Sequence, residues 1–153
     1  MKSILKQHIW VTAKRRELLI KPVMKRDSEV YSLRKGYSPF IYKSENGFTY
    51  CFPVSSGHAE INFEFDISEQ DLEVLKTNPF RFKALYYILF QEAQSTFGTG
   101  HPNPQKYTTE EFNNAKNIVL SKSENDLEQY IKEFSKRRNL GENYFQYFSS
   151  NVF

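Results

Sequence analysis

Acidic side chains are concentrated in one part of this 153-residue chain. Residues 44–75 contain seven Asp or Glu and no Lys or Arg. Carboxylates on one strand face are about 7 Å apart, which is too far for convergence on a metal ion. The same acids also suit a solvated strand face followed by a helix N-terminus. We expect six of them to form a partner-binding surface, namely Glu60, Glu64, Asp66, Glu69, Asp71 and Glu73.

The sequence contains no established catalytic, metal-binding or nucleotide-binding motif. His8, His58 and His101 lie far apart and lack the spacing of zinc ligands. Cys51 lies between two aromatic residues and suits a small core residue better than a nucleophile. Residues 98–104 contain two glycines but lack the Gly-Lys-Ser/Thr of a phosphate-binding loop. We therefore expect no catalytic residue, no cofactor and no metal ion.

Composition and length indicate a globular protein. Hydrophobic residues make up 39% of the chain and charged residues 25%. The longest apolar run, residues 84–90, is far shorter than the roughly 20 residues of a membrane span. The first residues show no apolar signal segment. A single cysteine excludes an intrachain disulfide and fits a reducing compartment. We expect a cytoplasmic protein without a membrane partner.

Charge is divided unevenly along the chain. Residues 1–43 carry 11 Lys or Arg and three acids, whereas residues 44–153 carry 10 and 15. The net charge is therefore +8 in the first part and −5 in the second. Such a distribution can steer charged partners, and it can equally hold the two parts together on folding.

The hydrophobic period changes at Ser68. Apolar residues alternate before it, as in a strand with one buried face, and recur every three or four residues after it, as in a helix. Because no helical segment separates the strands before Ser68, we expect a mainly antiparallel sheet over about residues 6–67. The predicted strands cover residues 8–13, 18–24, 30–33 and 59–67, with a hairpin over residues 40–52.

Local signals within this sheet add detail. Asn46-Gly47 favours a type I′ turn in the hairpin. Residues 53–58 are predicted to form the next turn. Three apolar residues of the last strand are expected in the core, namely Ile61, Phe63 and Phe65.

The second part of the chain, residues 68–140, is predicted to form three or more helices that pack on the sheet. The helix over residues 79–97 is apolar around most of its circumference, which is typical of a central helix. Its polar stripe is assigned to Lys83, Tyr87, Gln91 and Gln94. The predicted N-caps are Ser68, Thr108 and Ser123.

The last residues, 141–153, are strongly aromatic and are expected to be buried or to dock on another surface. Together these features predict one α+β domain over residues 1–153.

This profile is similar to the immunity proteins of bacterial contact-dependent growth inhibition and related polymorphic toxin systems. The similarity lies in size, element order, cytoplasmic character, an aromatic content of 16% and the missing catalytic signature. It covers the whole chain and rests on no motif, so it assigns no role to single residues. Proteins of this kind bind a cognate toxin domain, frequently a nuclease, and block it.

The leading expectation is therefore a non-enzymatic binding protein that neutralises a cognate toxin domain by occluding its active site. One alternative is a small nucleic-acid-processing enzyme that uses His58 or His101. Another is a nucleic-acid-binding module that uses the basic residues 1–43. Nucleic acid is the less expected partner, since Pro39 interrupts the basic–Gly–aromatic sequence of residues 35–42.

Overall fold

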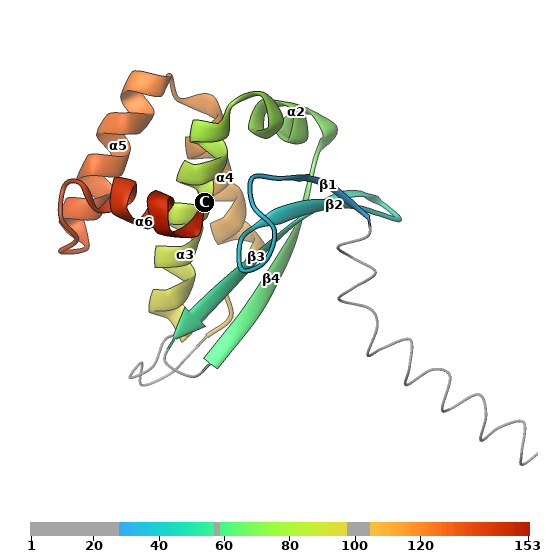
Figure 1. Cartoon of the computed structure of the whole chain (residues 1–153), viewed down its shortest axis with the longest axis horizontal. Helices are drawn as coiled ribbons and strands as arrows, with labels where there is room; N and C mark the ends of the chain where they lie inside the picture. The colour runs from blue at the N-terminus through green and yellow to red at the C-terminus, as the bar shows by residue number, and fades with distance from the viewer. Residues whose placement is uncertain (1–27, 57–58, 98–104) are drawn as a thin grey trace, which may run out of the picture.

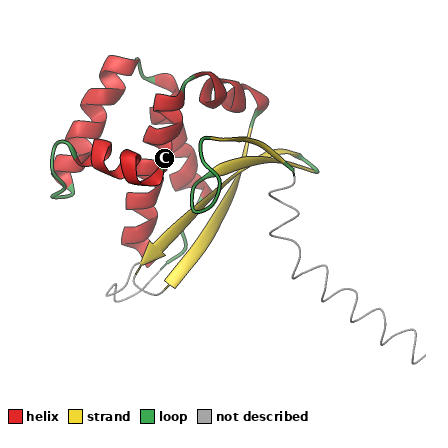
Figure 2. Ribbon diagram, viewed as in Figure 1, coloured by secondary structure: helices red, strands yellow, loops and turns green. Residues whose placement is uncertain are grey.

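The computed structural model describes residues 28–56, 59–97 and 105–153 of the chain. Within these residues, a four-stranded antiparallel sheet is followed by five helices, which makes the protein a single α+β domain (Figures 1 and 2). The predicted fold class is confirmed. The strands predicted at residues 8–13 and 18–24 lie outside the described residues.

The sheet is a meander in which each strand pairs with its neighbour in sequence, in the order β1-β2-β3-β4. β3 and β4 pair in continuous register from Phe48 opposite Ile67 to Ser56 opposite Ala59. β4 therefore forms one edge of the sheet within the described residues. The strands are β1 (Glu29–Ser32), β2 (Phe40–Ser44), β3 (Gly47–Ser56) and β4 (Ala59–Ile67).

The expected turn at residues 53–58 is wrong, because β3 continues through Pro53 to Ser56. Proline is tolerated where its missing N–H faces away from a neighbouring strand. The carbonyl of Pro53 accepts a hydrogen bond from the Tyr86 hydroxyl at 2.7 Å, and that of Ser55 accepts one from Gln94 Nε2 at 2.7 Å. Side chains of α3 (Pro79–Phe97) thus cover the edge of β3 where β2 has ended.

The predicted hairpin between β2 and β3 is confirmed, but its turn is not type I′. A type I′ turn needs positive φ at both central residues. Here Glu45 and Asn46 connect the strands, and the positive φ, 130°, belongs to Gly47. Glycine tolerates this angle without steric cost, so Asn46 does not need to adopt it.

All three predicted helix starts are confirmed. Ser68 and Thr108 accept hydrogen bonds from the backbone N–H three residues on, and the acids at those positions complete two capping boxes. Ser123 accepts from the backbone N–H of Asp126. Besides α3, the helices are α2 (Glu69–Thr77), α4 (Thr109–Ser121), α5 (Glu124–Arg137) and α6 (Tyr144–Val152).

α3 lies in the middle of the fold and is buried on several sides (Figure 1). Toward the sheet, Phe82 contacts the ring of Tyr50. On another side, the ring of Tyr87 lies 5.2 Å from Phe145 and 5.3 Å from Phe148 of α6. The aromatic tail therefore packs into the core, as expected. Tyr87 does not belong to a polar stripe, because it is fully buried and its hydroxyl is hydrogen-bonded to that of Ser135 at 2.7 Å.

Replacement of a buried tyrosine by phenylalanine should change the free energy of unfolding in opposite directions at two positions. Tyr86→Phe leaves the carbonyl of Pro53 without its donor, and should lower the free energy of unfolding by about 1–3 kcal/mol. The hydroxyl of Tyr50 is buried and finds no hydrogen-bond partner among the described residues. Tyr50→Phe should therefore raise the free energy of unfolding by about 1 kcal/mol. Urea denaturation measures both values, and an equal loss in both variants would contradict this assignment.

Candidate protein-binding surface

The outer face of β4 carries a row of exposed polar side chains. Strand alternation turns Phe63 and Ile67 toward the helices and Glu60, Glu64 and Asp66 away from them. The structure therefore places three of the predicted acids on one sheet face, where all three are exposed.

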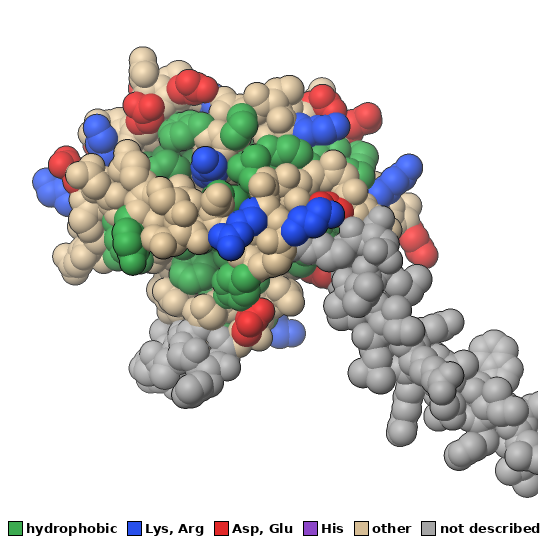
Figure 3. All heavy atoms as spheres, in the orientation of Figure 1, with side chains coloured by type: hydrophobic (Ala, Val, Ile, Leu, Met, Phe, Trp, Pro, Cys, Tyr) green, Lys and Arg blue, Asp and Glu red, His purple; other side chains and the backbone are tan. Residues whose placement is uncertain are grey.

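Two more of the predicted acids lie on α2, which follows β4 directly through Ser68. Glu69 and Glu73 lie four residues apart on the same side of this helix, and both are exposed. In the space-filling view, acidic side chains are visible near α2 beside a basic one, and others are spread over the rest of this face (Figure 3). We name Glu60, Glu64, Asp66, Glu69 and Glu73 the acidic surface.

Asp71, the sixth predicted residue, has a different position. Its carboxylate accepts a hydrogen bond from the Ser68 backbone at 3.0 Å and forms an ion pair with Lys116 of α4 at 2.8 Å. Burial raises the pKa of Asp71, but the hydrogen bonds from Lys116 and Ser68 and the charge of Lys116 outweigh it and hold the pKa below its usual value. Asp71 therefore fastens α2 to α4.

A shallow hollow of about 370 Å³ lies on the outer sheet face. The Thr49 hydroxyl donates to the carboxylate of Asp66 at 3.3 Å. This hydrogen bond orients the Asp66 side chain, which lines the hollow. Three carboxylates beside a tyrosine ring suit a Lys or Arg side chain. Among the described residues, no group of three His, Cys, Asp or Glu side chains could hold a metal ion. The hollow is lined by Tyr42, Ser44, Glu45, Asn46, Thr49, Glu64 and Asp66.

An apolar groove of about 690 Å³ lies between β4 and the segment that leads into α4. Tyr107 forms its far wall and contacts the rings of Phe63 and Phe65 edge-on. The groove explains why Ile61 is 41% exposed, contrary to the expectation that it lies in the core. We name this feature the β4 groove. It is lined by Ile61, Asn62, Phe63, Glu64, Phe65, Phe97, Gln105, Lys106 and Tyr107.

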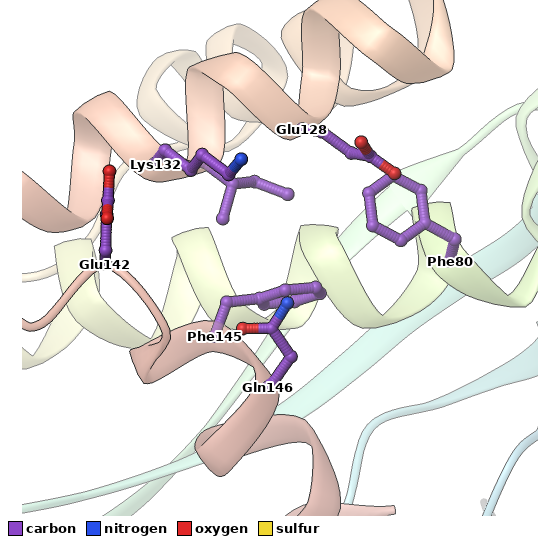
Figure 4. Close-up of a pocket in the computed structure, with 7 residues that line it drawn as sticks. Phe80, Glu128, Lys132, Glu142, Phe145 and Gln146 are labelled. Carbon is purple, nitrogen blue, oxygen red and sulfur yellow. The ribbon is translucent and has the colours of Figure 1, made fainter.

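A third hollow lies between α3, α5 and α6 (Figure 4). Its lining includes Phe80 and Phe145 together with side chains of both charges, Glu128, Lys132 and Glu142. Its volume of about 170 Å³ is below the roughly 300–1,000 Å³ of typical small-molecule sites. It offers no convergent set of groups for chemistry.

A partly buried carboxylate that no motif in the sequence indicates supports the wall of the β4 groove. The Tyr107 hydroxyl donates to Glu92 of α3 at 2.6 Å. Burial raises the pKa of Glu92, while the hydrogen bond from Tyr107 and the charge of Arg138 lower it, and the net result is a raised pKa. The pair anchors the segment before α4 to α3.

Most residues of the two alternative functions lie outside the described part of the chain. His58 and His101 lie outside the described residues, as do eight of the 11 Lys and Arg in residues 1–43. Within the described part of the chain, no helix combines the length and apolar character that crossing a membrane requires.

No family model matches the chain, and no curated protein or solved structure shows significant similarity to it.

Glu92→Gln tests the raised pKa of this carboxyl. The folded protein binds the Glu92 proton more tightly than the unfolded chain does, so its ionisation costs stability as the pH rises above about 4.5. Glutamine still accepts from Tyr107 but cannot ionise. The free energy of unfolding of the variant relative to the natural protein should therefore increase from about pH 4.5 to pH 7.

Urea denaturation across this pH range measures the difference, and Glu128→Gln on exposed α5 surface is the matched control for loss of one carboxylate. A difference that stays constant with pH would show that Glu92 ionises normally in the fold.

Proposed function

We propose that this protein is a non-enzymatic immunity protein that binds a basic toxin domain and covers its active site. The observation that carries the proposal is the acidic surface, whose five carboxylates on β4 and α2 are exposed and include two, Glu64 and Asp66, that line the hollow on the outer sheet face. A nuclease domain suits this surface, because nucleases bind phosphates with basic side chains. Carboxylates placed over such a site exclude the nucleic acid.

The charge of the described residues supports a basic partner. Residues 1–27 carry eight Lys or Arg and two acids, a net charge of +6. The described residues carry 13 Lys or Arg and 16 acids, a net charge of −3. The described part of the chain is therefore acidic, although the whole chain has a net charge of +3.

The two kinds of surface have different physical roles in binding. Exposed carboxylates accelerate the encounter with a basic domain, and their effect weakens as salt rises. Buried apolar contacts slow dissociation. The acidic surface and the β4 groove lie along the same strand, so one partner can use both.

Co-expression in bacterial cells tests the function. The probe is the domain encoded immediately upstream of the gene for this protein. That domain alone should stop growth, and co-expression of this protein should restore it. Growth arrest that this protein does not relieve would refute the proposal for that pair.

Charge reversal tests the surface. Glu64→Lys with Asp66→Lys should slow association with that toxin domain roughly tenfold at low salt and reduce the salt dependence of the rate. Glu128→Lys with Glu133→Lys on α5 makes the same change in net charge elsewhere and should leave the rate within about twofold. Stopped-flow or surface plasmon resonance measures the rates. Equal rates for the two double variants would show that the acidic surface is not the contact.

A further inference from the structure

The outer edge of β4 presents its main-chain groups to a binding partner. In an antiparallel pair, opposite residues either exchange hydrogen bonds or both turn their N–H and C=O groups away. Pro53 has no N–H and its carbonyl bonds to Tyr86, so its main chain faces away from β4. Its partner in the register is Asn62. The N–H and C=O of Asn62 therefore face the outer edge, and those of Glu60 and Asp66 do so by the same alternation.

Among the described residues, the other edges of the sheet are less suited to strand addition. β1 has four residues and an irregular register against β2. The part of β3 beyond the end of β2 is covered by Tyr86 and Gln94. β4, in contrast, has nine residues in regular register, and no strand among the described residues pairs with its outer edge. Long, regular edges of this kind accept an added strand.

The two faces beside this edge differ in character. On the inner face, the β4 groove offers apolar surface from Ile61, Phe63 and Phe97. On the outer face lie the carboxylates of Glu60, Glu64 and Asp66. Successive side chains of an added strand would alternate between these two environments.

The acids also select among occupants of the edge. If two copies of this chain paired antiparallel through β4, acidic residues would face acidic residues across the new pair, and like charges opposite one another are destabilising. A strand with Lys or Arg on the outer face has the complementary charge. The edge thus disfavours a second copy and favours a basic partner.

We infer that the partner adds an antiparallel strand to the outer edge of β4, with basic side chains over the acidic face and apolar side chains in the β4 groove. This inference rests on the proposed function, because it specifies how the basic domain is held. Main-chain hydrogen bonds fix the register, and the two rows of side chains determine which sequence binds.

A synthetic peptide of nine residues, alternating Lys and Val and blocked at both ends, is the probe. The full chain should bind it at low salt more tightly than a peptide of the same composition with Lys and Val in separate blocks. In antiparallel pairing, residues with outer-face side chains direct their N–H groups to β4. N-methylation of the lysines should therefore weaken binding at least tenfold, and N-methylation of the valines should change it less than twofold. Isothermal titration calorimetry measures the affinities.

Asn62→Pro provides the matching change in the protein, because it removes one outward N–H, while Asn62→Thr retains that N–H. Proline should weaken peptide binding at least tenfold, and threonine less than twofold. Thermal unfolding of both variants checks the fold, and the N-methylated peptides test the pairing even if the proline variant is unstable.

Three results would overturn the inference. The first is that the alternating peptide does not bind at millimolar concentration. The second is that the two N-methylation patterns weaken binding equally, and the third is that methylation of the valines weakens binding more than methylation of the lysines. Equal methylation effects together with tight, salt-dependent binding would exclude strand pairing and leave the acidic surface of the proposed function intact. Failure of the proposed function would appear separately, as unrelieved growth arrest in the co-expression experiment.

Discussion

The burial of α3 is the constraint on which the rest of the structure depends. This helix is apolar around most of its circumference, so every side needs a cover. The sheet covers one side through Tyr50 and Phe52, and α6 covers another through Phe145 and Phe148. α4 adds a layer that reaches the sheet where Phe112 stacks on Phe65 at 4.5 Å. This contact lies toward the end of β4, and the groove lies beside residues 61–65 of the strand.

Local signals in the sequence predicted the fold class and the helix starts. Hydrophobic alternation can be recognised within one strand, and a capping box within four residues. Neither signal depends on tertiary structure. The errors at Pro53 and Tyr87 arose where a distant residue supplies the hydrogen bond. Tyr86 lies 33 residues after Pro53, and Ser135 lies 48 residues after Tyr87. No local pattern indicates such partners.

The candidate site was predictable to a similar extent. Alternation placed Glu60, Glu64 and Asp66 on one face, and the structure does so too. The ion pair of Asp71 with Lys116 was not predictable, because it joins two residues that lie 45 positions apart in the chain and on different helices. The run of seven acids included Glu45, but only the hairpin brings that residue to the hollow. The β4 groove requires Tyr107 to lie beside Phe63, which sequence spacing alone does not reveal.

The aromatic core also determines how the protein responds to alkali. Burial raises the pKa of the hydroxyls of Tyr50, Tyr86 and Tyr107 above the ordinary tyrosine value of 10.0. Each of these groups keeps its proton in the folded protein and loses it near that value in the unfolded chain. Above about pH 10, every further rise in pH therefore favours the unfolded state. Tyrosine ionisation and loss of structure should coincide, so the ultraviolet absorbance of tyrosinate would serve as an internal indicator of unfolding.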